Sequence, residues 1–363
     1  MNVTLFRDLP TEGWHSMERY ADALAAALER LDCDVKSYVS ARPLPAQRGR
    51  IGTLANYAWR SIVYPLAARR HQGNINHIVD HSYAHLVNAL DARRTIVTCH
   101  DIAPLELDQR GRGLSRRLWN RSFRAMQHAA HIIADSTHTR DAILRNTDYP
   151  KERITVIPLG VSPEFFEPVS DADRQALRKR YGLADRRIVL HVGSCEPRKN
   201  LEAILQALPE LSDLNPVFVQ VGGAFHSTQT EAVAQGKLET RVIQAPAAFG
   251  RTLRAWYQIA DVFAFPSVYE GFGLPVIEAM AAGTPVVCAD ATSLPEVVGD
   301  AALLIDPRDP LTLAATIRSM LTDSALVHTL RQRGLERARL FTWEHCARET
   351  LKVYSELYQE LYA

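Results

Sequence analysis

The chain has no run of about 18 uninterrupted apolar residues, and neither a basic segment nor a long apolar one follows Met1. A membrane-spanning helix and a secretion signal are therefore not expected. The five cysteines are odd in number, lie far apart and include no CxxC pair. This spacing does not indicate a disulfide framework or a zinc site, and it is typical of a cytoplasmic protein with reduced, mostly buried thiols.

The sequence also lacks a complete glycine signature for dinucleotide binding. The loop after the first expected strand, residues 2–6, holds only Gly13. The GxG pairs that begin at Gly111 and Gly271 are not followed by a third glycine at the required spacing. The pattern therefore disfavours a dinucleotide-dependent oxidoreductase.

Potential metal ligands are present but poorly arranged. His77, His81 and His85 are spaced by four residues, yet the apolar residues after His77 indicate a strand instead of the helix that would bring residues four apart together at one metal ion. Asp32 and Asp34 form a DxD triplet at a strand entrance, which we interpret as a chance occurrence. We expect no metal ion and no organic cofactor.

The composition is that of an ordinary globular protein, and the length favours two domains. With 47% hydrophobic and 23% charged residues, disorder is not expected, and 363 residues exceed what one core usually supports. Residues 1–165 carry 22 Lys and Arg against 17 Asp and Glu, whereas the remainder carries 20 against 24. A basic first half suits an anionic partner such as a membrane surface or a lipid phosphate.

Short apolar runs alternate with helical patterns along the chain, as in Rossmann-like domains. In the first half, buried strands are expected over residues 76–82 and 94–101. The second of these ends in His100 and Asp101, and an adjacent carboxylate can orient or charge an imidazole. The alternative is a hydrogen-bonded histidine with a structural role.

Residues 110–124, RGRGLSRRLWNRSFR, form an expected basic helix in which aromatic residues lie among arginines. Such a helix can hold an anionic lipid surface or an anionic acceptor. The pattern alone leaves open nucleic-acid binding and an ordinary solvated helix face.

In the second half, an expected strand over residues 187–194 is followed by the loop CEPRKN and a helix. Arg198 and Lys199 stand at the start of this helix, where cations are unfavourable unless an anion compensates. Two cations and free backbone N–H groups would converge there on a diphosphate. Solvated basic residues are the alternative.

The stretch from Tyr269 to Ala282, YEGFGLPVIEAMAA, lies between two expected strands. Its glycine-flanked loop therefore falls at the carboxyl edge of a parallel sheet, where open α/β folds bind ligands. Pro275 suits the first turn of the helix that follows. Glu270 and Glu278 would then flank an anion site at the helix N-terminus, or they are only a helix cap and a solvated residue.

Several long motifs in this order resemble one family. HVGSCEPRKNL, VGG, ADVFAFPSVYEGFGLPVIEAMAAGTPVVCAD and SLPEVVGDAALLIDP, within residues 187–307, resemble the C-terminal domain of the retaining family 4 glycosyltransferases, also called glycosyl transferases group 1. VTCHDIAPLE, ADSTHTRDAI and VIPLGV are a looser match in the N-terminal half. The resemblance is carried by the combination of motifs rather than by any single one.

The resemblance implies an α/β protein with the GT-B fold, in which two Rossmann-like domains face each other across a cleft. Residues 1–165 would form the acceptor-binding domain and residues 166–344 the domain that binds the nucleotide-sugar donor. The last helix, residues 345–363, would cross back to the N-terminal domain.

Carried over by position, the resemblance implies that Arg198 and Lys199 bind the donor diphosphate and stabilise its charge as it leaves. Glu270 would face the transferred sugar, and Glu278 would bind the nucleotide ribose. His100 would contact the sugar and the acceptor region as a further catalytic residue. The other donor-binding positions would be Gly13, Ser136, Gly193, Ser194, Phe272, Gly273 and Leu274.

Two positions depart from the family pattern. Many members have a glycine pair in the first loop, where this chain has only Gly13. Ser194 stands where some members carry a further diphosphate-binding arginine. Arg198 and Lys199 would then bind the diphosphate without that help.

The resemblance implies a retaining, metal-independent hexosyltransferase in which the leaving phosphate takes the acceptor proton. PRKN, HDIAPLE and LPEVVGDAA resemble bacterial mannosyltransferases, which points to mannose from GDP-mannose. The acceptor would be a glycan or a lipid-linked glycan of a surface polysaccharide such as lipopolysaccharide, at the inner face of the cell membrane, with no nucleic acid as partner. The alternative is a nucleotide-sugar epimerase or a catalytically silent nucleotide-sugar-binding protein on the same fold.

Overall fold

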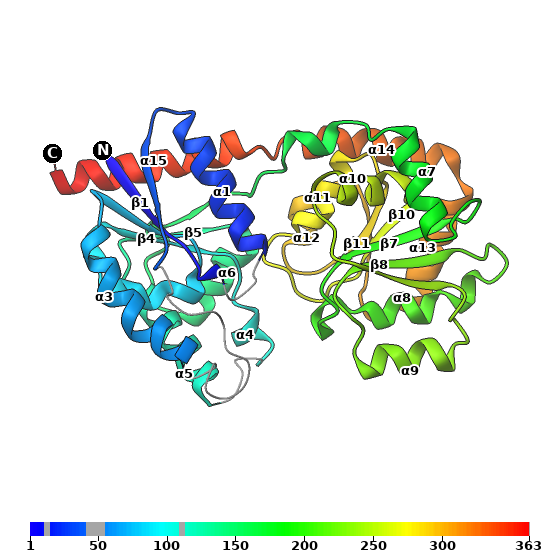
Figure 1. The fold of residues 1–363 in the computed structure, drawn as a ribbon, viewed down its shortest axis with the longest axis horizontal. Helices are drawn as coiled ribbons and strands as arrows, with labels where there is room; N and C mark the ends of the chain where they lie inside the picture. The colour runs from blue at the N-terminus through cyan, green and yellow to red at the C-terminus, as the bar shows by residue number, and fades with distance from the viewer. Residues whose placement is uncertain (11–14, 41–54, 109–112, 363) are drawn as a thin grey trace. The chain divides into compact units, whose positions relative to one another are not determined.

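The computed structural model describes residues 1–10, 15–40, 55–108 and 113–362, and the chain forms two compact units. Unit 1 comprises residues 1–160 and 343–363, and unit 2 comprises residues 161–342. Each unit is built on a six-stranded parallel sheet covered by helices (Figure 1). This is the Rossmann-like architecture that the alternation of strands and helices predicts.

The sheet of unit 1 has the strand order β2-β1-β3-β4-β5-β6, and all its strands are parallel. Its strands are mostly apolar because helices cover both faces. Ile78 and Val97 belong to a core formed with the helical segments between residues 64 and 126. The strands are β1 (Asn2–Phe6), β2 (Asp34–Tyr38), β3 (Ile75–Ile78), β4 (Thr95–Cys99), β5 (His131–Ala134) and β6 (Ile154–Val156).

The helical segments of unit 1 include short 3₁₀ and π-helical turns as well as α-helices. They are α1 (His15–Glu29), η2 (Trp59–Val63), α3 (Tyr64–Ala68), η3 (Arg69–His71), η4 (His81–Asn88), η5 (Ala92–Arg94), α4 (Ala103–Glu106), α5 (Leu114–Met126), α6 (Thr137–Asn146), η6 (Lys151–Arg153) and α15 (Trp343–Tyr362).

Helix α15 packs against α1 on the sheet of unit 1 (Figure 1). The hydroxyl of Tyr354 lies 2.5 Å from Nδ1 of His77 in β3. Nε2 of the same histidine lies 2.7 Å from the hydroxyl of Thr98, which also bonds the hydroxyl of Tyr20 in α1 at 2.9 Å. A buried chain of hydrogen bonds thus joins two strands to both helices, and the prediction that the last helix returns to the N-terminal domain is confirmed.

The predicted end of one strand in unit 1 is wrong. The sequence predicts a strand over residues 76–82, but β3 stops at Ile78 and the 3₁₀ helix η4 begins at His81. The reason is Asp80, whose carboxylate accepts hydrogen bonds from the N–H of Ser82 at 2.9 Å and from its hydroxyl at 2.6 Å. This cap favours a helical turn over a longer strand.

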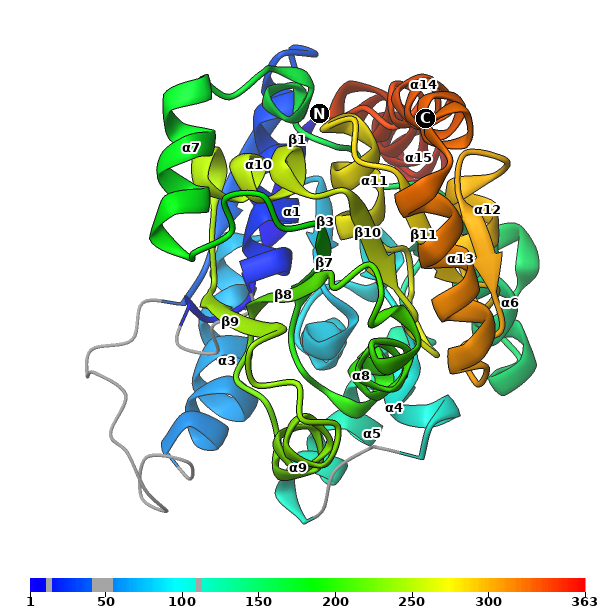
Figure 2. The same ribbon diagram turned by 90° about the vertical axis from the view of Figure 1, so that its right-hand side faces the viewer.

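The sheet of unit 2 has the order β12-β11-β10-β7-β8-β9, again all parallel. Figure 2 shows α8 and α13 on one side of this sheet and α10 and α11 on the other. The sequence of β10 explains this, because Val262 and Ala264 join the core of α8 and α13, whereas the Phe263 ring packs on Tyr257 of α10. The strands are β7 (Ile188–Gly193), β8 (Val217–Gly222), β9 (Val242–Pro246), β10 (Val262–Phe265), β11 (Val286–Ala289) and β12 (Leu303–Ile305).

The helices of unit 2 complete this layered arrangement. None of the helices in the described parts of the chain combines the length and the apolarity needed to cross a bilayer. The helical segments of unit 2 are η7 (Pro163–Phe166), α7 (Asp171–Arg180), η8 (Pro197–Lys199), α8 (Leu201–Ala207), η9 (Pro209–Leu211), α9 (Ser227–Gln235), α10 (Gly250–Ile259), α11 (Leu274–Ala281), α12 (Leu294–Val298), α13 (Pro310–Thr322) and α14 (Ser324–Ala338).

Candidate active site

The loop between β10 and α11 is held in place by hydrogen bonds from the segment that leads into α12. The hydroxyl of Ser293 donates to the carbonyl oxygens of Glu270 and Phe272, at 3.0 Å each. Gly273 ends the loop with a φ of +108°, and a Cβ there would lie 2.8 Å from Cδ2 of Leu294. A glycine is therefore required where the chain turns into α11.

Three charged side chains meet at this loop. Oε1 of Glu270 lies 2.6 Å from Nζ of Lys199, and Oε2 lies 3.3 Å from Nη1 of Arg198. Arg198 also donates to the carbonyl oxygen of Tyr269 at 3.3 Å, and its Nε lies 3.0 Å from Glu196. Both cations come from η8, which follows β7, so the fold brings the cations and the glutamate together at the carboxyl edge of the sheet. We call Arg198, Lys199 and Glu270 the charged cluster.

Two members of the charged cluster are buried. Lys199 is 7% exposed and Glu270 is 6% exposed. Burial alone would raise the pKa of Glu270, but the charges of Lys199 and Arg198 lower it, so the carboxylate is ionised at neutral pH. The carboxylate is shared by both cations, and Arg198 has Glu196 as a second carboxylate partner.

Two adjacent strands end in glycines at the same edge of the sheet. Gly193 of β7 and Gly222 of β8 lie opposite each other, and a Cβ on Gly222 would come within 2.2 Å of the Gly193 carbonyl oxygen. The glycine at position 222 therefore lets the backbones of the two strand ends approach each other more closely than a side chain would allow. Ser194 follows on the exposed loop that leads to η8.

Glu278 and the aromatic residues near it are held by other elements of unit 2. Glu278 lies on α11, is 3% exposed and accepts a hydrogen bond from the hydroxyl of Tyr257 on α10 at 2.9 Å. Phe272 is buried and packs edge-on against Phe341, with ring centroids 5.7 Å apart. Leu274 is the first residue of α11. Sequence reasoning missed Tyr257, because an aromatic residue on an amphipathic helix normally indicates packing alone.

His100 in unit 1 follows β4 directly and has both ring nitrogens engaged. Nδ1 lies 2.6 Å from Oδ2 of Asp135, and Nε2 lies 2.9 Å from the carbonyl oxygen of Val79. A carbonyl oxygen only accepts, so Nε2 carries a proton, and an ionised Asp135 makes Nδ1 a donor as well. Burial alone would lower the pKa of His100, but Asp135 and Asp80 raise it to about 9. Burial raises the pKa of Asp135 too, but the charge of His100 opposes that rise, so the two groups stabilise each other as an imidazolium and a carboxylate.

The carboxylate that charges His100 is not the one next to it in sequence. The sequence singled out Asp101, but Oδ1 of Asp101 accepts a hydrogen bond from the N–H of Ala103 at 2.9 Å, at the start of α4. Asp135 takes the role instead, because β5 lies beside β4 and is likewise followed directly by a polar residue. Its position at a strand end was the signal that could have identified it.

Ser136 lies one residue further on and caps α6. Its hydroxyl oxygen accepts a hydrogen bond from the N–H of Thr139 at 3.0 Å, and the Thr139 hydroxyl donates to the carbonyl oxygen of His100 at 3.4 Å. Ser136 and His100 are thus connected through one residue. Gly13, predicted to contact the donor, lies outside the described residues.

The described parts of the chain contain no group of three or more His, Cys, Asp or Glu side chains that could hold a metal ion. His77 bonds Tyr354 and Thr98. His85 instead faces the hydroxyl of Ser122 and a backbone carbonyl oxygen. These two histidines of the i, i+4 series therefore turn to different partners.

Comparison with known proteins identifies the family. Residues 17–165 match the family model described as Glycosyltransferase Family 4, and residues 173–337 match the one described as Glycosyl transferases group 1. The O-antigen chain mannosyltransferase B of Escherichia coli is 34% identical over 270 residues, which cover 73% of this chain and 71% of that protein. The chain belongs to glycosyltransferase family 4. It is a glycosyltransferase that uses a nucleotide-sugar donor.

Another relative and two solved structures are also similar to this chain, and the structures bear on the fold. The serotype-specific mannosyltransferase WbdA of Escherichia coli is 30% identical over 281 residues, which cover 73% of this glycosyltransferase but 34% of that longer protein. Among solved structures, sucrose-phosphate synthase from Thermosynechococcus elongatus has a TM-score of 0.78 at 24% identity and covers 99% of this chain and 100% of its own. Anabaena HepE, in complex with UDP and glucose, has a TM-score of 0.76 at 21% identity and covers 98% and 99%. The predicted GT-B fold is confirmed.

Proposed function

We propose that this glycosyltransferase moves mannose from GDP-mannose to a glycan or lipid-linked acceptor of a surface polysaccharide. Support for the sugar and for the acceptor class comes from the two mannosyltransferases of Escherichia coli, one of which is named for the O-antigen chain. The competing donor is a UDP-sugar, since HepE is described with UDP and glucose. Unit 2 would bind the donor and unit 1 the acceptor.

The observation that carries the proposal is the charged cluster at the carboxyl edge of the second sheet. A nucleotide-sugar presents a diphosphate, and Arg198 and Lys199 would bind it through charge-assisted hydrogen bonds. Negative charge grows on the leaving phosphate oxygen as the sugar bond breaks, so the same two cations would stabilise the transition state. Glu270, on the same cations, would accept hydrogen bonds from the sugar hydroxyls.

The state of His100 restricts the mechanism. With both ring nitrogens donating, the imidazolium has no lone pair with which to remove the acceptor proton. In a retaining transfer, the acceptor oxygen attacks from the side of the leaving group, and the departing phosphate would take that proton. His100 would then act through its charge and its position near the sugar.

The remaining residues complete the proposed donor site. Glu278 would bind the ribose, held in place by the hydroxyl of Tyr257. Backbone N–H groups at the start of α11 would face the sugar and the phosphates. The other proposed contacts are those of Gly13, Ser136, Gly193, Ser194, Phe272, Gly273 and Leu274.

The proposed place of action is the cytoplasmic face of the cell membrane, with the protein attached peripherally. Helix α5, which carries four arginines, supports this placement, because basic helices with aromatic residues bind anionic lipid surfaces.

Lys199→Ala tests the diphosphate assignment. Loss of one preorganised donor typically lowers kcat by about 100-fold to 1,000-fold, and we expect a loss of this order in mannose transfer from GDP-mannose. Lys352→Ala is the matched control, because Lys352 is exposed on α15 and pairs with Glu349. Normal turnover and donor affinity in Lys199→Ala would show that the assignment is wrong.

A thermal-shift panel of GDP-mannose, UDP-glucose and ADP-glucose tests the donor. A ligand at about 100 times its Kd stabilises the protein by about 2.7 kcal/mol, which is easily measured. A shift with the UDP-sugar alone would refute mannose from GDP-mannose, and no shift with any nucleotide-sugar would contradict the proposed donor site itself.

A further inference from the structure

A surface cavity of 400 Å³ lies beside helix α5 in unit 1. Its walls come from α5, from the turn that follows α5, and from the end of η4. Its polar lining residues are Asn88, Arg117, Asn120, Arg121, Arg124 and His128.

Helix α5 presents these side chains because its other face is anchored. Leu118 and Met126 are buried, and the hydroxyl of Ser122 donates to the carbonyl oxygen of Ser82 in η4 at 2.7 Å. Arg117, Arg121 and Arg124 follow one another at spacings of four and three residues, which places them along one exposed side of the helix. The arrangement is therefore fixed by the packing of α5 rather than by contacts among the arginines.

The cavity is cationic and has no carboxylate of its own. No Asp or Glu lines it, and within the ranges that the structure describes, none of Arg117, Arg121 and Arg124 forms an ion pair. Like charges at these spacings repel each other along a helix. The repulsion disappears if an anion binds between them.

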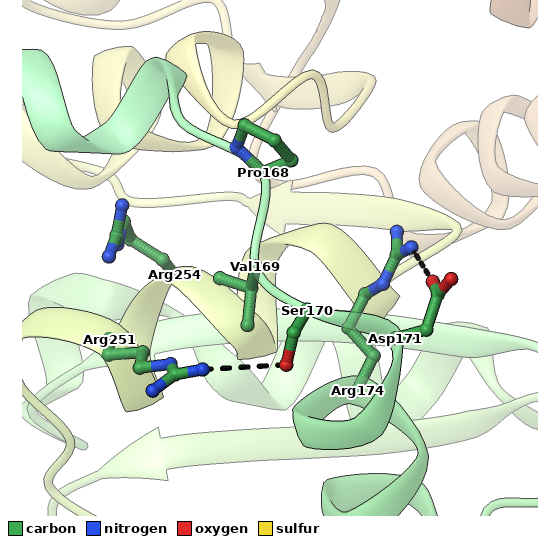
Figure 3. A pocket seen from close by; sticks show the side chains of 7 residues that line it. All are labelled: Pro168, Val169, Ser170, Asp171, Arg174, Arg251 and Arg254. Atoms are coloured by element: carbon green, nitrogen blue, oxygen red, sulfur yellow. Dashed lines mark hydrogen bonds and ion pairs between the residues drawn. The ribbon is translucent and has the colours of Figure 1, made fainter.

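A second cavity, in unit 2, is also lined by arginines, and it serves as a comparison because these arginines have partners within the protein. Figure 3 shows three arginines around it, with Arg174 directed at Asp171 and Arg251 directed at Ser170. Each guanidinium there has a carboxylate partner in the protein. The pairs are Arg174 with Asp171, Arg251 with Asp173, and Arg254 with Glu167.

We propose that the α5 cavity is a binding site for a phosphate group carried by a membrane lipid or by a soluble organophosphate. Guanidinium groups bind phosphate oxygens in pairs, and the amide groups of Asn88 and Asn120 add neutral donors. The volume of 400 Å³ lies within the range of small-molecule sites, roughly 300–1,000 Å³, and leaves room for the group that carries the phosphate.

This site shares no residue with the charged cluster, so it would not bind the diphosphate of the donor. If the phosphate belongs to a lipid, the site would provide the proposed peripheral attachment, and the inference then rests on that part of the proposed function. If the phosphate is soluble, the inference is independent of it. Binding measured without any donor therefore tests it separately from the transfer reaction.

The test compares two triple variants of the full chain that lose the same charge. Arg117→Gln with Arg121→Gln and Arg124→Gln empties the α5 cavity of guanidinium groups. Arg174→Gln with Arg251→Gln and Arg318→Gln, the control, removes arginines that pair with carboxylates. Co-sedimentation is measured with vesicles of phosphatidylcholine, with and without phosphatidylglycerol, and glycerol 1-phosphate is titrated by calorimetry.

One arginine near an anionic surface contributes about fivefold to binding, so the α5 triple variant should bind phosphatidylglycerol vesicles about a hundredfold more weakly. The control variant should bind like the wild type. If glycerol 1-phosphate binds with the same arginine dependence and vesicles do not, the phosphate is a soluble one. Equal losses in both triple variants, or no binding of either probe by the wild type, would overturn the proposal.

Asn120→Asp gives a second test that keeps every arginine and the fold of α5. The introduced carboxylate would stand next to Arg121 and one helical turn from Arg117 and Arg124, and would neutralise them as the carboxylates do in unit 2. We expect weaker binding of whichever probe the wild type binds, at an unchanged melting temperature. Unchanged binding would contradict the site, because position 120 lies among its lining residues.

Discussion

Replacing Glu270 by Gln should destabilise unit 2 in a way that the donor nucleotide reverses. The substitution keeps the shape of the side chain but removes the charge that faces Lys199 at 2.6 Å and Arg198 at 3.3 Å. Lys199 is 7% exposed, so water cannot replace the lost partner. Breaking a buried ion pair from one side costs roughly 3–5 kcal/mol, and we expect about 3 because Gln still accepts a hydrogen bond.

Nucleoside diphosphate should restore most of this loss. If the diphosphate binds Arg198 and Lys199, its negative charge replaces the missing carboxylate, and the difference between variant and wild type should shrink to about 1 kcal/mol or less. GDP would therefore stabilise Glu270→Gln more than it stabilises the wild type, although the variant is the less stable protein without ligand.

Hydrogen exchange of the β10 amides, with and without GDP, measures the stability of unit 2 by itself. Asp213→Asn is the matched control, because its ion pair with Arg318 lies on the surface of the same unit, with side chains 60% and 40% exposed. A surface pair contributes at most about 1 kcal/mol. The reasoning fails if Glu270→Gln is no more destabilising than Asp213→Asn, or if GDP stabilises variant and wild type equally.

Two further predictions concern unit 1. The pKa of His100 is raised from 6.5 to about 9, so its pair with Asp135 stabilises the folded state by about 3 kcal/mol below pH 6.5. This contribution is lost as the pH rises towards 9. Urea denaturation should show this decline for the wild type and not for Asp135→Asn; a flat wild-type profile would disprove the imidazolium. Tyr354→Phe removes the buried hydroxyl next to His77 and should cost about 1–3 kcal/mol in the same assay, whereas Tyr362→Phe, at an exposed position, should have little effect.

The sequence was most informative where function depends on backbone position. The strand, glycine loop and helix around residues 260–282 could be placed from pattern alone, because parallel strands put such loops at one edge of the sheet. The same argument placed Arg198 and Lys199 at that edge. Their ion pairs with Glu270 required the fold, since 71 residues separate Lys199 from its partner.

Partners that come from other elements were not predictable. Asp135 and Tyr257 reach His100 and Glu278 from a neighbouring strand and a neighbouring helix, and no local pattern specifies either contact. The predicted end of one strand, β3, was also wrong because of a local side-chain interaction. The apolar residues after Asn76 favour a longer strand, but the Asp80 cap is a side-chain interaction that periodicity does not detect.

The return of α15 to unit 1 has a consequence for synthesis on the ribosome. The hydrogen bond between His77 and Tyr354 joins residues 277 positions apart, and all of unit 2 is made between them. Unit 2 is a continuous segment and can fold as it emerges, whereas unit 1 has to wait for its final helix, and contacts at such separation form slowly. Until then, His77 lacks its hydrogen-bond partner Tyr354, so we expect the first half of a newly made chain to reach its final structure after unit 2 does.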